Sequence, residues 1–339
     1  MSVATSSAPE PRPGEAPLDY AARGPHPVGV RTVELRDTSD PDRRLTTDLW
    51  YPAVADADGP EAEHPFGQPH RAVMDAPARS LAAPLVAFSH GNGGLRRQST
   101  FLTTHLASWG FAVVAPDHAG NTFFDTLAHA DDDERIAAHK LACTNRPRDV
   151  LAAVAAAEEG RFGDVAVDAS RWLALGHSFG GWTATKLPAL DARVAGVGLL
   201  APASEPFVGS RAYRDGELPF ATPTPTLVVA GIEDVLVDLD SSVRPHVRRL
   251  GPATELVGLE AADHFHFCDG IPLLHGRHAE TIRPRQPRSA LPYERTLEAE
   301  RCQRAVAALV TWHFAPAAAG TGIIDDTRLA ALEPAARRL

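Results

Sequence analysis

The hexapeptide Gly176-His177-Ser178-Phe179-Gly180-Gly181 constrains this chain more than any other stretch. It follows the short apolar run Trp172-Leu173-Ala174-Leu175 and precedes residues 182–187, which contain neither Gly nor Pro. This order predicts a strand, a sharp turn and a helix, the context in which Gly-x-Ser-x-Gly forms a nucleophile elbow. A serine held in such a strained turn needs neighbours without a Cβ, and the glycines at 176 and 180 meet that need.

Short apolar runs alternate with helical patterns along the rest of the chain. Buried parallel strands are expected at 85–88, 111–115, 172–175, 194–200, 226–231 and 254–259, the last of these being the final strand. More polar runs at 28–36 and 45–51 predict an antiparallel edge. Helical segments are expected at 98–109, 131–141, 147–159, 239–250 and 294–314. The sequence therefore predicts an α/β fold with a mostly parallel central sheet, helices on both faces and an antiparallel N-terminal edge.

The domain organisation follows from composition. We find no internal repeat and no Pro/Ser-rich linker in the core, so residues 25–315 are expected to form a single α/β domain with loop insertions. Residues 1–24 lack the basic and apolar parts of a signal peptide and are predicted to be a disordered leader. Residues 316–339 are expected to be a C-terminal tail. Whether the loops 121–145 and 201–225 form a lid is left open by the sequence.

Charge and cysteine usage exclude several classes of partner. The 339-residue chain has a net charge of −10, which argues against a nucleic-acid partner or an anionic membrane surface. No stretch approaches the roughly 18 apolar residues of a membrane span. Cys143, Cys268 and Cys302 are odd in number and widely spaced, which indicates no disulfide framework and predicts a cytoplasmic protein. A small-molecule substrate is the expected partner, and nothing in the sequence indicates an oligomeric state.

A nucleophilic serine needs a base within hydrogen-bond reach, and the base needs a carboxylate to orient it. In a parallel sheet these groups are expected just past the carboxyl ends of strands. Asp234 stands three residues beyond the predicted strand at 226–231 and is the candidate acid. Its neighbours Glu233 and Asp238 are alternatives if that strand ends elsewhere.

The candidate base is His264, which comes directly after the predicted strand at 254–259. His266 is its rival in the same segment. The chain order Ser178, Asp234, His264 is the order of nucleophile, acid and base expected for α/β-hydrolases.

The glycine-rich loop His90-Gly91-Asn92-Gly93-Gly94 follows the predicted strand at 85–88. We assign the backbone N–H groups of Asn92 and Phe179 to an oxyanion hole, since donors of this kind stabilise the charge that develops on an attacked carbonyl. A phosphate-binding loop is the weaker interpretation, because the segment lacks Gly-Lys-Ser/Thr and the dinucleotide spacing.

Aromatic residues near these loops are candidates for a substrate pocket: Phe123, Trp182 and Phe265. Trp182 stands four residues past the serine and is expected to crowd the acyl side. His275 and His278 have the spacing of metal ligands, but no matching carboxylate or thiolate set accompanies them. Neither a metal nor a cofactor is therefore expected.

Five segments together resemble the α/β-hydrolase superfamily, and within it the dienelactone-hydrolase-like proteins and platelet-activating-factor acetylhydrolases. The matching segments are residues 48–53, 88–94, 115–118, 176–181 and 264–269. The resemblance implies Ser178 as nucleophile, His264 as base and the Asn92 loop as oxyanion donor. The last segment fits the family pattern His-x-x-Phe-x-Asp, which favours His264 over His266. One departure is that the acetylhydrolases carry their acid near the position of Leu200-Ala201-Pro202, whereas Asp234 fits the dienelactone-hydrolase-like position.

These observations predict a serine hydrolase that cleaves carboxylic esters through an acyl-enzyme intermediate, with a Ser-His-Asp triad. Two alternatives stay open: a triad hydrolase that acts on amides or thioesters, and a ligand-binding protein built on a hydrolase fold. The sequence does not indicate the natural substrate or the acyl chain length.

Overall fold

The computed structural model describes residues 19–36, 40, 43–65, 67–204, 213, 216–281, 288–319 and 326–339. Most of the expected leader, part of the loop 201–225 and part of the expected tail lie outside these ranges.

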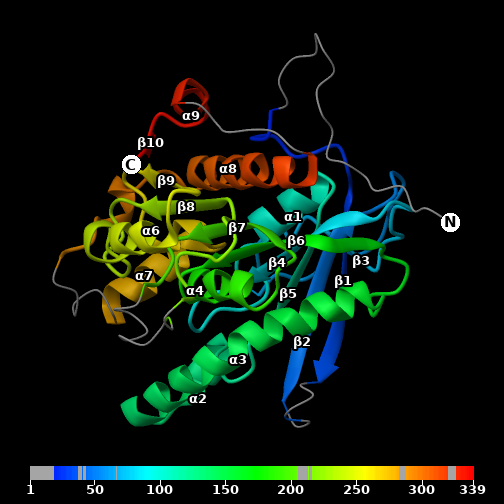
Figure 1. The fold of residues 1–339 in the computed structure, drawn as a ribbon, viewed down its shortest axis with the longest axis horizontal. Coiled ribbons are helices and arrows are strands. Elements are labelled where there is room, and N and C mark those ends of the chain that lie inside the picture. The colour runs from blue at the N-terminus through cyan, green and yellow to red at the C-terminus, as the bar shows by residue number, and fades with distance from the viewer. Residues whose placement is uncertain are drawn as a thin grey trace.

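A single ten-stranded sheet forms the centre of the molecule, in the order β10-β9-β8-β7-β6-β4-β5-β2-β1-β3 (Figure 1). The strands are β1 (Val28–Arg36), β2 (Arg44–Pro52), β3 (Val73–Met74), β4 (Ala83–Ser89), β5 (Ala112–Pro116), β6 (Val167–His177), β7 (Val194–Leu200), β8 (Thr226–Gly231), β9 (Thr254–Leu259) and β10 (Ala336–Arg338). Neighbouring strands from β5 through β4 to β9 run parallel, while β2 pairs antiparallel with both β1 and β5. The predicted mostly parallel sheet with an antiparallel N-terminal edge is confirmed.

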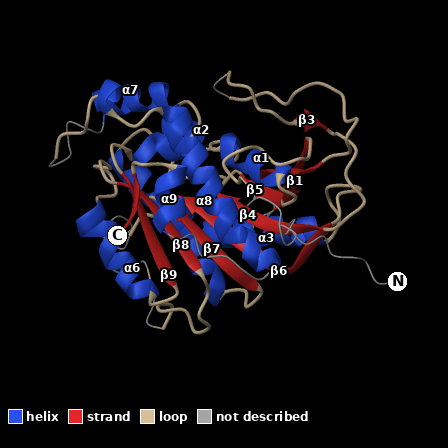
Figure 2. Ribbon diagram, turned by 90° about the horizontal axis from the view of Figure 1, so that it is seen from above, coloured by secondary structure: helices blue, strands red, loops and turns tan. Residues whose placement is uncertain are grey.

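Helices cover both faces of this sheet, as Figures 1 and 2 show. The helices are α1 (Thr100–Ser108), α2 (Phe123–Ala128), α3 (Asp132–Glu158), α4 (Phe179–Lys186), α6 (Arg244–Leu250), α7 (Ile271–Thr281), α8 (Ala299–Ala319) and α9 (Asp326–Leu332). Short turns of 3₁₀ or π geometry are η1 (Leu187–Ala189), η2 (Leu239–Val243), η3 (His264–Phe267) and η5 (Tyr293–Arg295). Among the described helices, none combines the length and the apolarity that crossing a bilayer requires.

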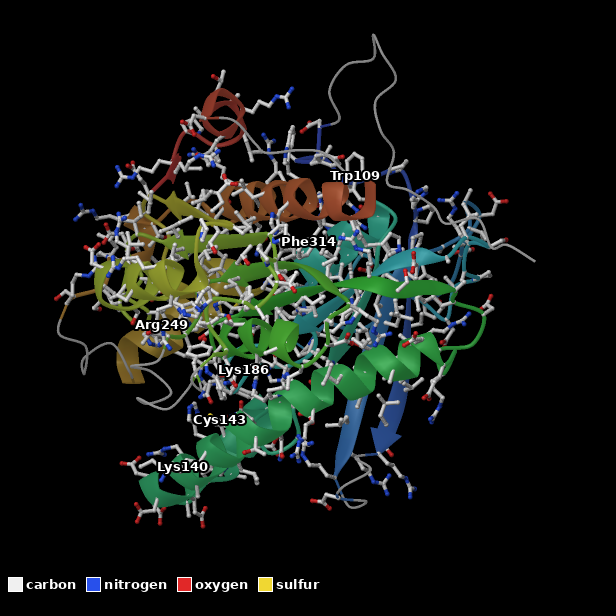
Figure 3. All side chains as sticks on the ribbon, viewed as in Figure 1. Trp109, Lys140, Cys143, Lys186, Arg249 and Phe314 are labelled. Atoms are coloured by element: carbon white, nitrogen blue, oxygen red, sulfur yellow. The ribbon has the colours of Figure 1, made fainter. Side chains whose placement is uncertain are left out.

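The alternation of side chains along each strand divides the core into two layers. In β4, Val86 and Phe88 pack in the layer of α1 and α8, whereas Leu85 and Ala87 pack in the layer of α3 and α4. Phe314 of α8 is fully buried in the first layer and lies on the opposite side of the sheet from the α4 helix (Figure 3). Because both faces are covered, the central strands are apolar in nearly every position, which is why they were recognisable from sequence.

Two helices expected at 131–141 and 147–159 are in fact one, α3, which continues through Pro147. A proline inside a helix removes one hydrogen bond and normally ends or kinks it. Here the residues after Pro147, including Val150 and Val154, are buried against the sheet, so packing maintains the helix across the proline. The first half of α3 and the helix α2, by contrast, extend past the sheet (Figure 1).

The strand at 254–259 is not the final one, contrary to our expectation. Residues expected to form a tail include the end of α8, helix α9 and strand β10, which pairs antiparallel with β9. Strand β10 has only three residues, two of them arginines, so no apolar alternation in the sequence announces it.

Truncating Phe314, the buried aromatic residue of α8, should destabilise the fold. Phe314→Ala is expected to lower the free energy of unfolding by about 3–5 kcal/mol, because it leaves a cavity among buried apolar side chains. Leu190→Ala is the matched control, since Leu190 is 55% exposed and its loss should cost less than about 0.5 kcal/mol. Urea unfolding of both variants measures the difference, and equal midpoints would contradict the assigned packing.

Candidate active site

The elbow, residues 176–181, joins β6 to α4 and holds Ser178 in a conformation that non-glycine residues rarely adopt, with φ 55° and ψ −118°. The surrounding backbone is too close for side chains. A Cβ on Gly176 would lie 2.0 Å from the carbonyl oxygen of Gly180, and a Cβ on Gly180 would lie 1.8 Å from that of Ser89. The two glycines are therefore required by contacts between backbone atoms.

The structure brings Ser178, His264 and Asp234 into one line of hydrogen bonds. His264 Nε2 lies 2.9 Å from Ser178 Oγ, and His264 Nδ1 lies 2.7 Å from Asp234 Oδ2. All three side chains are buried. The other carboxylate oxygen, Asp234 Oδ1, accepts from the N–H groups of Leu236 and Val237 at 2.8 and 2.9 Å, which fixes its orientation. Since the carboxylate can only accept, Nδ1 carries the proton and Nε2 is free to accept from the serine hydroxyl.

The alternatives that the sequence left open are engaged elsewhere. His266 Nε2 donates to the carbonyl of Leu297 at 2.9 Å, so this ring anchors the chain after β9. Glu233 pairs with Arg288 at 3.1 Å. Asp238 caps the turn η2 by accepting backbone N–H groups.

A cavity of about 410 Å³ opens beside Ser178 at the carboxyl edge of the sheet. Its lining residues are Gly91, Asn92, Gly93, Gly94, Leu95, Gln98, Phe123, His177, Ser178, Leu236, His264, Phe265, Cys268 and Leu274. The candidates Phe123 and Phe265 are among them. No Asp, Glu, Lys or Arg contributes to the lining within the described parts of the chain.

Trp182 does not line this cavity, contrary to our expectation. It is 2% exposed and packs between Phe179 and Tyr213, with ring centroids 5.2 and 6.4 Å away. The ammonium of Lys186, labelled in Figure 3, lies 5.3 Å from the centre of the Trp182 ring. Ser178 stands at the turn, whereas Trp182 lies one helical turn further on and belongs to a cluster with Phe179, Tyr213 and Ala142 of α3.

The loop of residues 90–94, called the glycine loop below, lies directly against the serine. A Cβ on Gly91 would be 3.5 Å from Ser178 Cβ. Asn92 lines the cavity, and its side-chain oxygen accepts from Asn121 Nδ2 at 2.9 Å. Phe179 is the first residue of α4, so its N–H has no partner within the helix. Both predicted oxyanion donors therefore belong to segments that meet at Ser178.

A buried cation beneath this loop was not recognised from the sequence. Arg146 of α3 is fully buried, and it donates to Asn121 Oδ1 at 2.6 Å, to Thr183 Oγ1 at 3.1 Å and to the His90 carbonyl. Its guanidinium lies 4.6 Å from the Phe179 ring centroid. Burial lowers the pKa of Arg146 to about 9. Nothing in the charged first half of α3 distinguishes this arginine from solvated ones.

The chain after β9, residues 263–269, is called the histidine loop below, and it is tied to helix α1. Asp269 closes the pattern His-x-x-Phe-x-Asp, and its carboxylate accepts from Thr100 Oγ1 at 2.7 Å and from the Phe101 N–H at 3.1 Å. The Asp269 N–H donates to the Gln98 carbonyl at 2.7 Å. The aspartate of the pattern thus caps α1, a role that its residue type permits but its position in the sequence does not reveal.

Among the residues that the structure describes, no group of three or more His, Cys, Asp or Glu side chains is arranged to hold a metal ion. His275 Nε2 lies 3.2 Å from Asp263 Oδ2.

Comparison with known proteins identifies a matching family and similar solved structures. The family described as platelet-activating factor acetylhydrolase, isoform II, matches residues 72–146, which contain the glycine loop but end before the elbow. The ferulic acid esterase from Streptomyces cinnamoneus is similar in structure with a TM-score of 0.69 and 22% identity, over 94% of this chain and 98% of that one. No curated protein matches the chain. At this identity the structural likeness establishes the fold, which is the α/β-hydrolase fold expected from the motifs.

Crowding the elbow should be far more damaging than adding a methyl group elsewhere. Gly180→Ala is expected to lower the free energy of unfolding by about 3 kcal/mol or more, because the new Cβ meets backbone that cannot turn aside. Gly276→Ala in α7 is the control, since no atom lies within 4 Å of the new Cβ. It should leave stability unchanged or raise it by about 0.5–1 kcal/mol. Urea unfolding compares the two, and a Gly180→Ala protein as stable as the control would refute the close contact.

Proposed function

We propose that this α/β-hydrolase is a serine esterase, which cleaves carboxylic esters through an acyl-enzyme formed on Ser178. One observation carries the proposal: the hydroxyl of Ser178, the imidazole of His264 and the carboxylate of Asp234 are aligned at 2.9 and 2.7 Å beside an apolar cavity. The match to an acetylhydrolase family and the esterase with the same fold both support ester hydrolysis.

The geometry supports the following sequence of steps. His264 Nε2 takes the proton of Ser178 as its oxygen attacks the ester carbonyl. The N–H groups of Asn92 and Phe179 donate to the oxyanion of the tetrahedral intermediate. His264 then gives the proton to the leaving alcohol and later activates water for deacylation, while Asp234 holds Nδ1–H in place.

The cavity suggests the substrate class. Its volume of about 410 Å³ lies near the lower end for small-molecule sites, and its side walls include Leu95, Phe123, Leu236, Phe265 and Leu274. A lining without charged side chains favours an uncharged acyl or aryl group over a phospholipid head group. Esters of aromatic acids are the first class to examine, since the solved esterase is named for ferulic acid.

The working environment is also part of the proposal. Cys143, Cys268 and Cys302 are free thiols, and two of them are buried. Free cysteines suit a reducing compartment, so we place the protein in the cytoplasm.

Removing the nucleophile should abolish turnover. Ser178→Ala is expected to lower kcat on p-nitrophenyl butyrate by about 10⁴–10⁶-fold, because the oxygen that becomes acylated is gone.

Asp234→Asn should lower kcat by about 10⁴-fold, since an amide stabilises the wrong tautomer of His264. Ser170→Ala is the control, because Ser170 lies on the exposed end of β6 and bonds only its neighbour Asp168.

A fluorophosphonate probe adds a second readout, since it labels only an activated serine. Labelling of the native protein but not of Ser178→Ala is expected. Unchanged ester turnover by Ser178→Ala would refute the proposal. Labelling without ester turnover would instead indicate a triad that acts on amides or thioesters, and no labelling would indicate a ligand-binding protein.

Widening the cavity should change the acyl preference. Phe123→Ala is expected to raise kcat/KM for long acyl chains relative to acetate by several-fold per added methylene, at about 0.8 kcal/mol for each newly buried CH₂. A panel of p-nitrophenyl esters from acetate to palmitate measures the ratio. Phe124→Ala is the control, because Phe124 is 67% exposed and does not contribute to the lining. An unchanged profile in Phe123→Ala would show that the acyl group binds elsewhere.

A further inference from the structure

The side-chain amide of Gln98 lies between the glycine loop and the elbow. The Gly91 N–H donates to Gln98 Oε1 at 2.9 Å, so the oxygen of this amide faces the loop. The Nε2 group then faces His177 and lies 2.9 Å from its Nδ1. Because Gln98 is only 7% exposed, bulk water cannot readily replace either bond.

One tautomer of His177 satisfies both of its neighbours. Its Nε2 lies 3.0 Å from the carbonyl oxygen of His264, which can only accept, so Nε2 carries the proton. Nδ1 then has the lone pair that the Gln98 amide needs, and Cys268 Sγ approaches the same atom to 3.7 Å. Burial, together with the nearby His264, lowers the pKa of His177 well below its ordinary value, so the ring stays neutral.

The hydrogen bonds continue in the same direction from donor to acceptor beyond Gln98 and beyond His177. At one end, Arg146 Nη2 donates to the His90 carbonyl, and the N–H of that same peptide group is the one that donates to the glutamine. At the other end, the peptide group that begins with the His264 carbonyl donates its N–H, that of Phe265, to Asp263 Oδ1 at 3.0 Å. Every donor points from a buried cation toward a buried carboxylate, an order in which each bond polarises the next.

We propose that Gln98 and His177 are positioning residues, and that this one-way chain of hydrogen bonds holds the glycine loop, the elbow and the histidine loop in register for the reaction. The inference rests on the proposed esterase function, because it explains how three separate segments keep the oxyanion donors, the nucleophile and the base aligned. Neither residue belongs to the triad, and the predicted catalytic set did not include them.

This chain of hydrogen bonds also determines which backbone N–H of the glycine loop remains free to bind an oxyanion. The Gly91 N–H is already used by Gln98, so it is not available to an oxyanion. The next N–H, that of Asn92, is left as the donor of this loop. Losing the glutamine would release the Gly91 N–H and allow the loop to rotate, and a displacement of about 1 Å at a catalytic group can cost about 100-fold in rate.

The tautomer is the first test and needs no substrate. Protein labelled with ¹⁵N at histidine is compared with His177→Gln, which identifies the His177 signals by their loss. We expect a neutral ring protonated at Nε2 from pH 5.5 to pH 8. An imidazolium signal, or a neutral ring protonated at Nδ1, would overturn the proposed direction of the hydrogen bonds.

Two substitutions at Gln98 then separate positioning from packing. Gln98→Met keeps the length of the side chain but removes both bonds, and kcat is expected to fall about 10–100-fold with KM changed less than about threefold. Gln98→Glu keeps the acceptor for Gly91 but offers no donor to His177. The contact with residue 98 returns, with its direction reversed, when His177 takes a second proton at Nδ1 and donates it to the carboxylate, so an imidazolium signal should appear near neutral pH.

The pH dependence of the two variants distinguishes the roles further. At pH 6 Gln98→Glu should retain more kcat than Gln98→Met, and this advantage should disappear as pH rises and His177 loses the extra proton. Gln68→Met is the control for the substitution itself, because Gln68 is exposed and lies outside the cavity. Urea unfolding identifies any variant that is merely unfolded.

The outcomes separate this inference from the proposed function. If native protein neither turns over esters nor reacts with a fluorophosphonate, the esterase proposal fails, whatever the histidine signals show. If native protein is active and Gln98→Met keeps the native kcat and labelling rate, the esterase proposal stands and the positioning chain is refuted. A loss of stability in Gln98→Met without a loss of kcat also refutes it, since that result indicates packing alone.

Discussion

Where the elbow crosses the end of β4, two stretches of backbone touch with no side chain between them. A Cβ on Gly180 would lie 1.8 Å from the carbonyl oxygen of Ser89, so the distance between β4 and the start of α4 is set by peptide dimensions. That distance fixes where Ser178 projects and where the first N–H of α4 points. It also fixes the glycine loop, which leaves β4 at the next residue. The histidine loop is then aligned to this arrangement through Gln98 and His177.

The parts of the fold that could be predicted from sequence are those encoded by local pattern. Strands β8 and β9 were located to the residue, because β8 is a short run buried throughout and β9 is buried from Leu256 onward. The alignment of Ser178, Asp234 and His264 was expected because only certain residue types, placed after strand ends, suit the chemistry. The glycines of the elbow were readable for the same reason, since no other residue fits there.

What the sequence did not reveal depends on contacts between distant segments. Helix α3 passes through Pro147 because the sheet supports it, and Trp182 faces α3 because of the direction in which α4 leaves the turn. Arg146 and Gln98 resemble solvated surface residues in the sequence, yet both are buried by loops that arrive from elsewhere. Their partners include backbone groups, the Gly91 N–H and the His90 carbonyl, whose positions exist only once the chain has folded.

A very short strand lies at each end of the sheet. Strand β3 has two residues and β10 has three, of which two are arginines. An unpaired strand edge is the usual template on which a second chain adds itself, and β10 offers only three residues, two of them charged, for that pairing. Copies of this protein would therefore gain little by pairing through β10, and the same shortness limits fibril growth from that end of a ten-stranded sheet rich in Val and Leu.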